Sequence, residues 1–377
     1  MLEIKGVYTS ATVYSQTLED YAAAQIQAIC DNETAQNSKI RLMPDVHPGK
    51  VGPIGLTMTI GDKLMPNLIG IDIGCGISYL CIGDTKVEFQ RLDSIIRAKL
   101  PTGSRVRKEP HHRVVEFDYN HLTCAKHVDQ DKADLSLGTL GGGNHFLELD
   151  RDEQGQIYVF VHSGSRRLGK EVTEFYLKEG QKRLKKEGVR RPDGTPIPYE
   201  LTYLEGQLLQ DYLHDLQVVQ EYASLNRGIM LMELTKNMKW KAQDEGESVH
   251  NYVDESGILR KGAAAAHSGQ EVIIPVNMRD GIILGTGKGN QDWNCSAPHG
   301  AGRILRRDEV KKFHTVSEYR DIMKGIYSPT VGKETLDEAP FAYRGIQEIL
   351  DAVGETVEVR EVLKPLYNYK GGEEKNG

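Results

Sequence analysis

Residues 51–82 read VGPIGLTMTIGDKLMPNLIGIDIGCGISYLCI, and this stretch decides the class of fold. Short apolar runs alternate here with glycine and proline, a pattern typical of short strands joined by tight turns. We therefore predict strands within 51–60, 64–73 and 76–82.

Outward from this stretch, helical and strand patterns alternate irregularly. We predict helices at 17–30, at 86–100, through 171–238 with a break at 190–198, and within 336–359. Further strands are predicted at 157–163, 257–261, 271–275 and 281–285. Because no regular βαβ alternation appears, the sequence predicts an α+β fold with a single domain over 1–377, whose polar tail 372–377 is disordered.

Composition limits the classes of function. The 377 residues are 39% hydrophobic, enough for a sizeable core, and the net charge of −7 excludes binding of polyanions by bulk charge. Five cysteines without a CxxC pair argue against a disulfide framework and a zinc ribbon. No secretory pattern and no window of about 18 apolar residues is present, so we expect a cytoplasmic protein with no membrane contact.

Four short words place a metal-binding side chain beside glycine or asparagine. They contain Asp72 with Cys75, His145, His162 and His250. Carboxylate, thiolate and imidazole together suit a borderline divalent ion, and a thiolate can bridge two ions. Taken alone, each of these residues has a simpler structural explanation. A histidine beside glycine, for example, is more often a turn or core residue than a metal ligand.

The word Ser296-Ala-Pro-His299-Gly300-Ala301-Gly302-Arg303 predicts a nucleophile. A neutral imidazole can attack phosphorus, while the glycine amides and the guanidinium suit a phosphate. A helix-capping turn with a surface histidine remains the alternative. No Walker or GxGxxG signature is present, since Gly285-Thr-Gly-Lys288 lacks the required spacing.

Eight words follow one another along the chain: Met43-Pro-Asp-Val-His47-Pro-Gly-Lys50, Gly70-Ile-Asp-Ile-Gly-Cys-Gly76, Leu137-Gly-Thr-Leu-Gly-Gly-Gly-Asn-His-Phe146, His162-Ser-Gly-Ser-Arg166, Ala223-Ser-Leu-Asn-Arg227, His250-Asn-Tyr252, Arg260-Lys-Gly-Ala263 and His299-Gly-Ala-Gly-Arg303. Together they resemble the RtcB family of RNA-splicing ligases, from about Arg41 to Gly371. The resemblance implies mixed, mostly antiparallel sheets that form a central sandwich flanked by helices.

The resemblance also implies a reaction and its cofactors. His299 would attack the α-phosphorus of GTP, and the guanylate would pass to an RNA 3′-phosphate, formed where necessary from a 2′,3′-cyclic phosphate. A 5′-hydroxyl RNA end would then displace GMP, in RNA repair or tRNA splicing. Two Mn²⁺ ions would be bound, one by Asp72, Cys75 and His145, the other by Cys75, His162 and His250. An activating protein partner remains open.

The same resemblance implies the binding residues. Those expected to contact the nucleotide are Asn144, Phe146, Leu147, Glu148, Asn251, the turn Pro275, Val276, Asn277 and Met278, then Gly300, Ala301, Gly302 and Lys370. Glu148 would accept hydrogen bonds from guanine. Arg166, Arg303 and Arg307 are expected to bind RNA phosphates, with Lys50 and Asn226 as weaker candidates.

Some positions depart from the family pattern. Pro275-Val-Asn-Met278 replaces the Pro-Gly-Ser-Met of the family pattern, and Ile282 replaces a serine. The segment Ala263–Gly269 lacks an arginine that is often found in the family. These departures suggest a divergent paralogue for repair of a particular RNA. Two rival functions remain: a metal-dependent phosphoesterase that opens cyclic phosphates without ligation, and a non-catalytic RNA-binding subunit.

Overall fold

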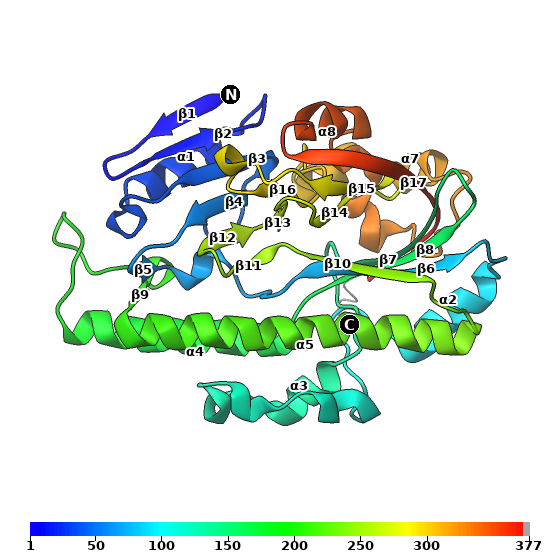
Figure 1. Ribbon diagram of the computed structural model, residues 1–377, viewed down its shortest axis with the longest axis horizontal. Helices are drawn as coiled ribbons and strands as arrows, with labels where there is room; N and C mark the ends of the chain where they lie inside the picture. The colour runs from blue at the N-terminus through cyan, green and yellow to red at the C-terminus, as the bar shows by residue number, and fades with distance from the viewer. Residues whose placement is uncertain (372–377) are drawn as a thin grey trace.

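Two large sheets dominate the computed structural model, which describes residues 1–371 (Figure 1). The first has six strands, in the order β1 (Leu2–Lys5), β2 (Ser10–Val13), β3 (Ile40–His47), β4 (Ile54–Thr59), β12 (Ile258–Lys261) and β11 (Asn251–Val253). All its neighbouring strands are antiparallel except β2 and β3.

The second sheet has seven strands and curves towards a barrel (Figure 1). Its order is β10 (Asp244–Val249), β6 (Gly76–Gly83), β8 (Ile157–Ser163), β7 (Phe146–Arg151), β17 (Val357–Lys370), β15 (Gly281–Gly287) and β14 (Glu271–Asn277). Every neighbouring pair is antiparallel. Three of the pairings in β14, β15 and β17 contain register shifts, which bend the strands.

A small sheet connects the two large ones. Strand β13 (Ala263–Ala265) pairs with β16 (Ser296–Pro298), and β13 contacts both β4 and β14 while β16 contacts β3. The segment that follows β16 therefore emerges between the two large sheets. Elsewhere, β5 (Lys63–Leu64) pairs with β9 (Leu204–Glu205).

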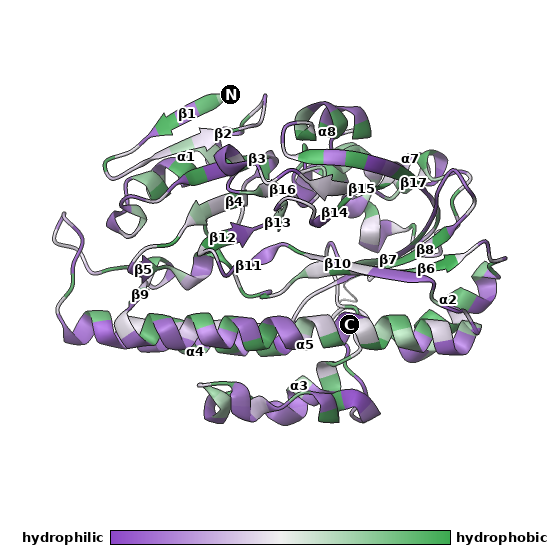
Figure 2. Cartoon of the chain, in the orientation of Figure 1, coloured by the Kyte–Doolittle hydropathy of each residue, from purple (hydrophilic) through white to green (hydrophobic). Residues whose placement is uncertain are grey.

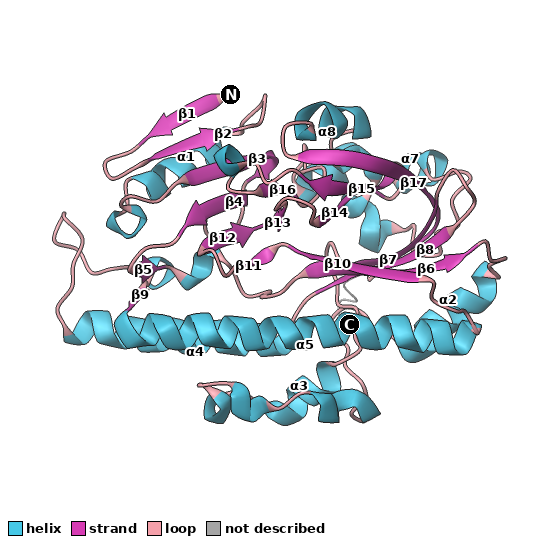
Figure 3. Ribbon diagram, in the orientation of Figure 1, coloured by secondary structure: helices cyan, strands magenta, loops and turns pink. Residues whose placement is uncertain are grey.

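Helices surround the sheets, and the third of them packs on the fourth rather than on a sheet (Figure 3). They are α1 (Asp20–Cys30), α2 (Phe89–Lys99), α3 (Gln130–Ser136), α4 (Arg166–Lys186), α5 (Gly206–Met238), α6 (Arg307–Phe313), α7 (Val316–Ile322) and α8 (Ile346–Val353). The long helix α5 packs against β6, β8 and α4. Apolar and polar residues alternate along α5 (Figure 2), and its buried side includes Leu216, Val219 and Tyr222.

The α+β class with mostly antiparallel sheets is confirmed. Within residues 1–371, no helix combines the length and apolar character needed to cross a membrane. The predicted disorder of 372–377 concerns residues outside those described.

Several local predictions differ from the structure. The expected strand at 64–73 is wrong: after the two residues of β5, Pro66–Leu68 form a 3₁₀ turn and Gly70 has a φ of +94°. The helix expected from residue 17 begins at Asp20. Residues 275–277, predicted as a turn, end strand β14. The 14-residue strand β17 was not predicted at all.

Candidate active site

The topology of the seven-stranded sheet brings four of the predicted metal ligands to one edge. Strands β10, β6, β8 and β7 are antiparallel neighbours, so the end of one lies beside the start of the next. His250 follows β10, Cys75 precedes β6, His162 is near the end of β8, and His145 precedes β7. Residues up to 175 positions apart thus meet in space, as the separation of Cys75 from His250 shows.

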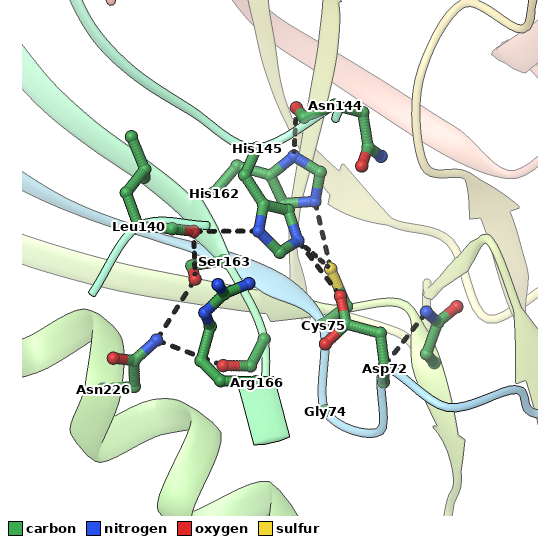
Figure 4. A network of polar contacts seen from close by, with 12 residues as sticks. Asp72, Gly74, Cys75, Leu140, Asn144, His145, His162, Ser163, Arg166 and Asn226 are labelled. Carbon is green, nitrogen blue, oxygen red and sulfur yellow. Dashed lines mark hydrogen bonds and ion pairs between the residues drawn. The ribbon is translucent and has the colours of Figure 1, made fainter. Parts of the chain in front are cut away.

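The candidate ligand atoms form two overlapping groups, and within each group they lie within 4.8 Å of one another. One group is Asp72, Cys75 and His145 (Figure 4), and the other is Cys75, His162 and His250. The Cys75 Sγ lies 3.5 Å from the Nε2 of His145 and 3.3 Å from the Nε2 of His162. These are the two predicted triads, with the thiol in both. The structure brings the residues together, and their role as ligands stays a prediction.

Main-chain carbonyls orient two of the imidazoles. His145 Nδ1 lies 2.8 Å from the Leu140 carbonyl oxygen, and His162 Nδ1 lies 3.2 Å from that of Asn144 (Figure 4). Each Nδ1 must carry a proton to donate to these oxygens, so each Nε2 keeps its lone pair. The Nε2 atoms of His162 and His250 are only 3.2 Å apart. With its proton on Nδ1, His162 directs the Nε2 lone pair to a position that a cation shared with His250 could occupy.

Burial controls the protonation of the cluster. It lowers the pKa of His162 and of His250 well below the usual range, which leaves both neutral. It raises the pKa of the Cys75 thiol, so a bound cation would be needed to favour the thiolate. Burial also acts to raise the pKa of Asp72, but the polar contact with His145 outweighs it and brings the value to about 2.

Helix α5 supports the loops of the cluster through Asn226 and Arg227, both fully buried. Asn226 donates to the carbonyl oxygens of Thr139 and Gly164 (Figure 4). Arg227 donates to the carbonyl oxygens of Gly74 and Ser163, each at 2.8 Å. The weaker prediction that Asn226 binds RNA is therefore wrong, because its side chain is fully buried and its amide group already donates to the loops of the cluster.

The nucleophile candidate lies beside this cluster. The His299 ring centroid is 4.9 Å from that of His250, and His299 Nδ1 is 2.7 Å from the Asp45 Oδ2. Asp45 is fully buried and also accepts from the His299 main-chain N–H. This contact fixes the proton on Nδ1 and leaves Nε2 free. Asp45 was not predicted to act in the site, although its carboxylate lies two residues before His47 in one of the family words.

A pocket extends from the cluster past His299. Most residues predicted to contact a nucleotide line it: Asn144, Phe146, Glu148, Pro275, Val276, Asn277, Met278, Gly300, Ala301, Gly302 and Lys370. His47 and Tyr343 line it as well and were not predicted. The His47 Nδ1 faces the Asp45 carbonyl oxygen at 2.9 Å, and burial lowers the pKa of His47 to about 4, so its ring is neutral.

Two predicted contact residues lie elsewhere. The Leu147 side chain is fully buried in the core on the opposite face of β7 from Phe146 and Glu148, because successive strand residues point to opposite faces. Asn251 donates to the Asp72 carbonyl oxygen and accepts from Gly262, so it supports the metal loop rather than the pocket. Ile282 is also buried in an apolar cluster, away from the pocket.

Two ionisable groups stand at the far wall of the pocket. Lys370 Nζ lies 3.1 Å from Glu338 Oε2 and 5.6 Å from the Phe146 ring centroid. Glu148 accepts from the Asn368 amide, while its Oε1 is buried without a donor among residues 1–371. Burial raises the pKa of Glu148 to about 7. Glu148 thus offers an unsatisfied acceptor to a ligand.

The three predicted RNA-binding arginines all have partners within the protein, and only two of them line the pocket. Arg166, with φ of +53°, donates to the Gly103 carbonyl oxygen at 2.8 Å. Arg303 and Arg307 line the pocket and pair with Glu338, and Arg307 also pairs with Asp337. A second, wider pocket shares Arg307 and Lys370 with the first. Its other basic lining residues are Arg97, Arg105, Lys311 and Lys333.

Comparison with known proteins finds relatives that match over most of the chain. The family described as tRNA-splicing ligase RtcB matches residues 25–371. RNA-splicing ligase RtcB of Escherichia coli K12 is 30% identical over 374 residues, which cover 88% of this chain and 90% of that protein. The tRNA-splicing ligase RtcB of Pyrobaculum aerophilum is 26% identical over 415 residues, covering 86% of this chain and 85% of that protein.

Proposed function

Because this chain belongs to the RtcB family of tRNA-splicing ligases, we propose that it is a GTP- and Mn²⁺-dependent RNA ligase. It joins an RNA 3′-phosphate or 2′,3′-cyclic phosphate end to a 5′-hydroxyl end. One observation supports this most. His299 lies between a cluster of five side chains that could bind metal and a pocket in which Glu148 offers a free hydrogen-bond acceptor to a nucleotide base, as judged among residues 1–371.

His299 is the nucleophile in this proposal. With its Nδ1 proton held by Asp45, the Nε2 lone pair attacks the α-phosphorus of GTP. A bond forms between Nε2 and phosphorus, and the bond to the bridging oxygen breaks, which releases pyrophosphate. Asp45 stabilises the positive charge that the ring acquires, because the carboxylate is buried beside it.

Two further displacements complete the reaction. An oxygen of the RNA 3′-phosphate attacks the guanylate phosphorus and breaks its bond to Nε2, which restores the imidazole. The 5′-hydroxyl oxygen then attacks the 3′-phosphate and releases GMP, and the strand is sealed. A cyclic phosphate end must first take up water to open. GMP serves as the leaving group that a bare phosphate monoester lacks.

The two triads would hold the ions, with Asp72, Cys75 and His145 around one and Cys75, His162 and His250 around the other. Bound Mn²⁺ would neutralise phosphate charge and polarise the attacking and leaving oxygens. The protein contributes imidazoles that burial keeps neutral and carbonyl oxygens that fix their orientation.

Arg166, Arg303 and Arg307 are proposed to contact RNA phosphates. Arg303 and Arg307 would exchange a carboxylate partner for a phosphate, since both now contact Glu338. The basic second pocket continues from Arg307, which gives an RNA strand a route to the site.

The test is a joining assay with RNA that carries a 3′-phosphate and a 5′-hydroxyl, in the presence of GTP and Mn²⁺. We expect a sealed product from the wild-type protein and none from His299→Ala. Absence of sealing by the wild type under these conditions would contradict the proposal.

A second candidate function is supported by the metal cluster alone, because that cluster is complete without His299. A phosphoesterase that opens cyclic phosphates would use the ions and would not need the nucleophile. RNA ending in a 2′,3′-cyclic phosphate separates the two: opening without any sealing by the wild type favours the phosphoesterase.

A further inference from the structure

We propose that Glu148 and Asp150 share one proton, held on Asp150, and that this proton keeps Glu148 an ionised acceptor for the base of the bound nucleotide. Asp150 is thereby a positioning residue that determines the preference for guanine. The identity of the ligand in this inference rests on the proposed function. The position of the proton rests on the geometry of β7.

Strand geometry places the two carboxyl groups together. Glu148 and Asp150 are two residues apart on β7, so both side chains leave the same face of the sheet. Glu148 reaches the pocket, whereas Asp150 is fully buried behind it. The two carboxyl groups are close enough for each to shift the pKa of the other.

Hydrogen bonding requires a proton between these groups. If both were carboxylates, three buried oxygens would have no donor among residues 1–371: Glu148 Oε1 and both oxygens of Asp150. An uncompensated buried carboxylate is costly, and two in contact cannot both ionise. A single proton on Asp150 lets its hydroxyl donate a hydrogen bond, and a Glu148 oxygen accepts that bond.

The surroundings assign the proton to Asp150. Its strand neighbours in register are Tyr158 and Pro365, and apolar residues such as Phe160 and Ile282 fill this face. The Ile282 main-chain N–H is near Asp150 but makes no hydrogen bond of normal geometry with it. Burial and the neighbouring carboxyl raise the pKa of Asp150 well above its usual range.

Glu148 has the partners that favour ionisation. Asn368 donates to its Oε2, and the positive charge of Lys370 on the same strand, β17, lies nearby. Burial raises the pKa of both groups, but only Glu148 has such partners, so Glu148 is the one of the two that ionises and presents an anionic oxygen to the pocket. Guanine offers two adjacent N–H donors on one edge, whereas adenine presents an acceptor at the corresponding ring nitrogen, so an ionised Glu148 selects guanine.

Two variants of Asp150 test the role. Asp150→Asn keeps an N–H donor that can face Glu148. Asp150→Leu removes the donor but has a side chain of similar size. The measurement is the rate of covalent protein labelling by α-labelled GTP relative to ATP, with Mn²⁺ present. We expect the preference for GTP to persist in D150N and to fall by about tenfold or more in D150L.

Equal preference in the wild type and D150L would overturn the proposal, as would a loss in D150N as large as in D150L. Infrared spectroscopy of protein with ¹³C-labelled aspartate provides an independent measurement. A protonated carboxyl band at neutral pH is expected in the wild type and should be absent from D150N; its absence from the wild type would refute the shared proton.

The infrared result does not depend on catalysis or on the folding of D150L. If no nucleotide labels the wild type, the proposed function fails, while the band still decides where the proton resides. If GTP labels the wild type and the band is missing, only the present inference fails.

Discussion

His299 and Asp45 form the residue contact on which the proposed chemistry depends most closely. The 2.7 Å distance between Nδ1 and Oδ2 sets the tautomer and the direction of the attacking nitrogen. We predict that Asp45→Asn lowers the rate of guanylate transfer to the protein by about 10²- to 10⁴-fold, because an amide can stabilise the wrong tautomer.

The measurement for D45N is single-turnover labelling by GTP, with Mn²⁺ affinity as the control. Asp45 belongs to neither metal-binding triad, so affinity should be unchanged. A labelling rate within twofold of the wild type would contradict the role assigned to Asp45.

Arg166 and Arg167 offer a matched comparison at adjacent positions. Arg166 points to the loop at Gly103 and Thr139, near the cluster, while Arg167 pairs with Glu171 on the surface of α4. We predict that Arg166→Ala weakens RNA joining about tenfold or more but spares formation of the guanylate adduct, and that Arg167→Ala changes neither. Loss of the adduct in R166A as severe as in H299A would show that Arg166 does not act on RNA.

Single side chains also show which features of the site could be predicted from the sequence and which could not. The five candidate metal ligands and His299 stood out because each lies in a short word with glycine or asparagine, and the family resemblance grouped them. Leu147 was expected to contact the nucleotide because the family resemblance implied it. Its side chain points to the core because strand residues alternate. Asp45 was missed since its partner is 254 positions away.

Among the elements, α5 contributes most to the site without touching the pocket. The guanidinium of Arg227 is fully buried, joins Gly74 and Ser163, and pairs with Glu247, which is itself one-third exposed. We predict that Arg227→Met destabilises the protein by about 3 kcal/mol, towards the low end for a broken buried pair because solvent reaches Glu247. It should also weaken Mn²⁺ binding.

Chemical unfolding and metal titration measure both effects of R227M. Lys236→Met is the control, because Lys236 is exposed on the same helix. If R227M bound Mn²⁺ as tightly as K236M, the loops of the cluster would not depend on α5.

Elements with a plain apolar pattern were predictable, and those with mixed signals were not. Strand β8 was predicted at 157–163 and is found at Ile157–Ser163. Strand β17 was missed because its charged residues and Pro365 interrupt the pattern. In the fold a register shift lies between Pro365 and Tyr367, where a missing N–H is tolerated.

At the scale of the whole molecule, the proposed Mn²⁺ ligands lie at the ends of four strands and in the loops beside them, so we expect metal binding to be coupled to folding. Ions that bind only the folded state stabilise it, by about 2.7 kcal/mol per site at 100 times the dissociation constant. We predict that Mn²⁺ raises the Tm of the wild type and leaves that of Cys75→Ala unchanged, because Cys75 belongs to both triads. Thermal unfolding with and without Mn²⁺ measures this.

Cys81→Ala is the matched control for this effect, as Cys81 is a buried thiol outside the cluster. An equal rise in Tm for C75A and the wild type would exclude Cys75 as a shared ligand.

The most direct test of the mechanism is mass spectrometry of the protein after incubation with GTP and Mn²⁺. A mass increase equal to one guanylate, mapped to the peptide that contains His299 and absent from H299A, is the predicted result. An adduct mapped to another residue, or sealing of RNA by H299A at the wild-type rate, would contradict the proposed mechanism.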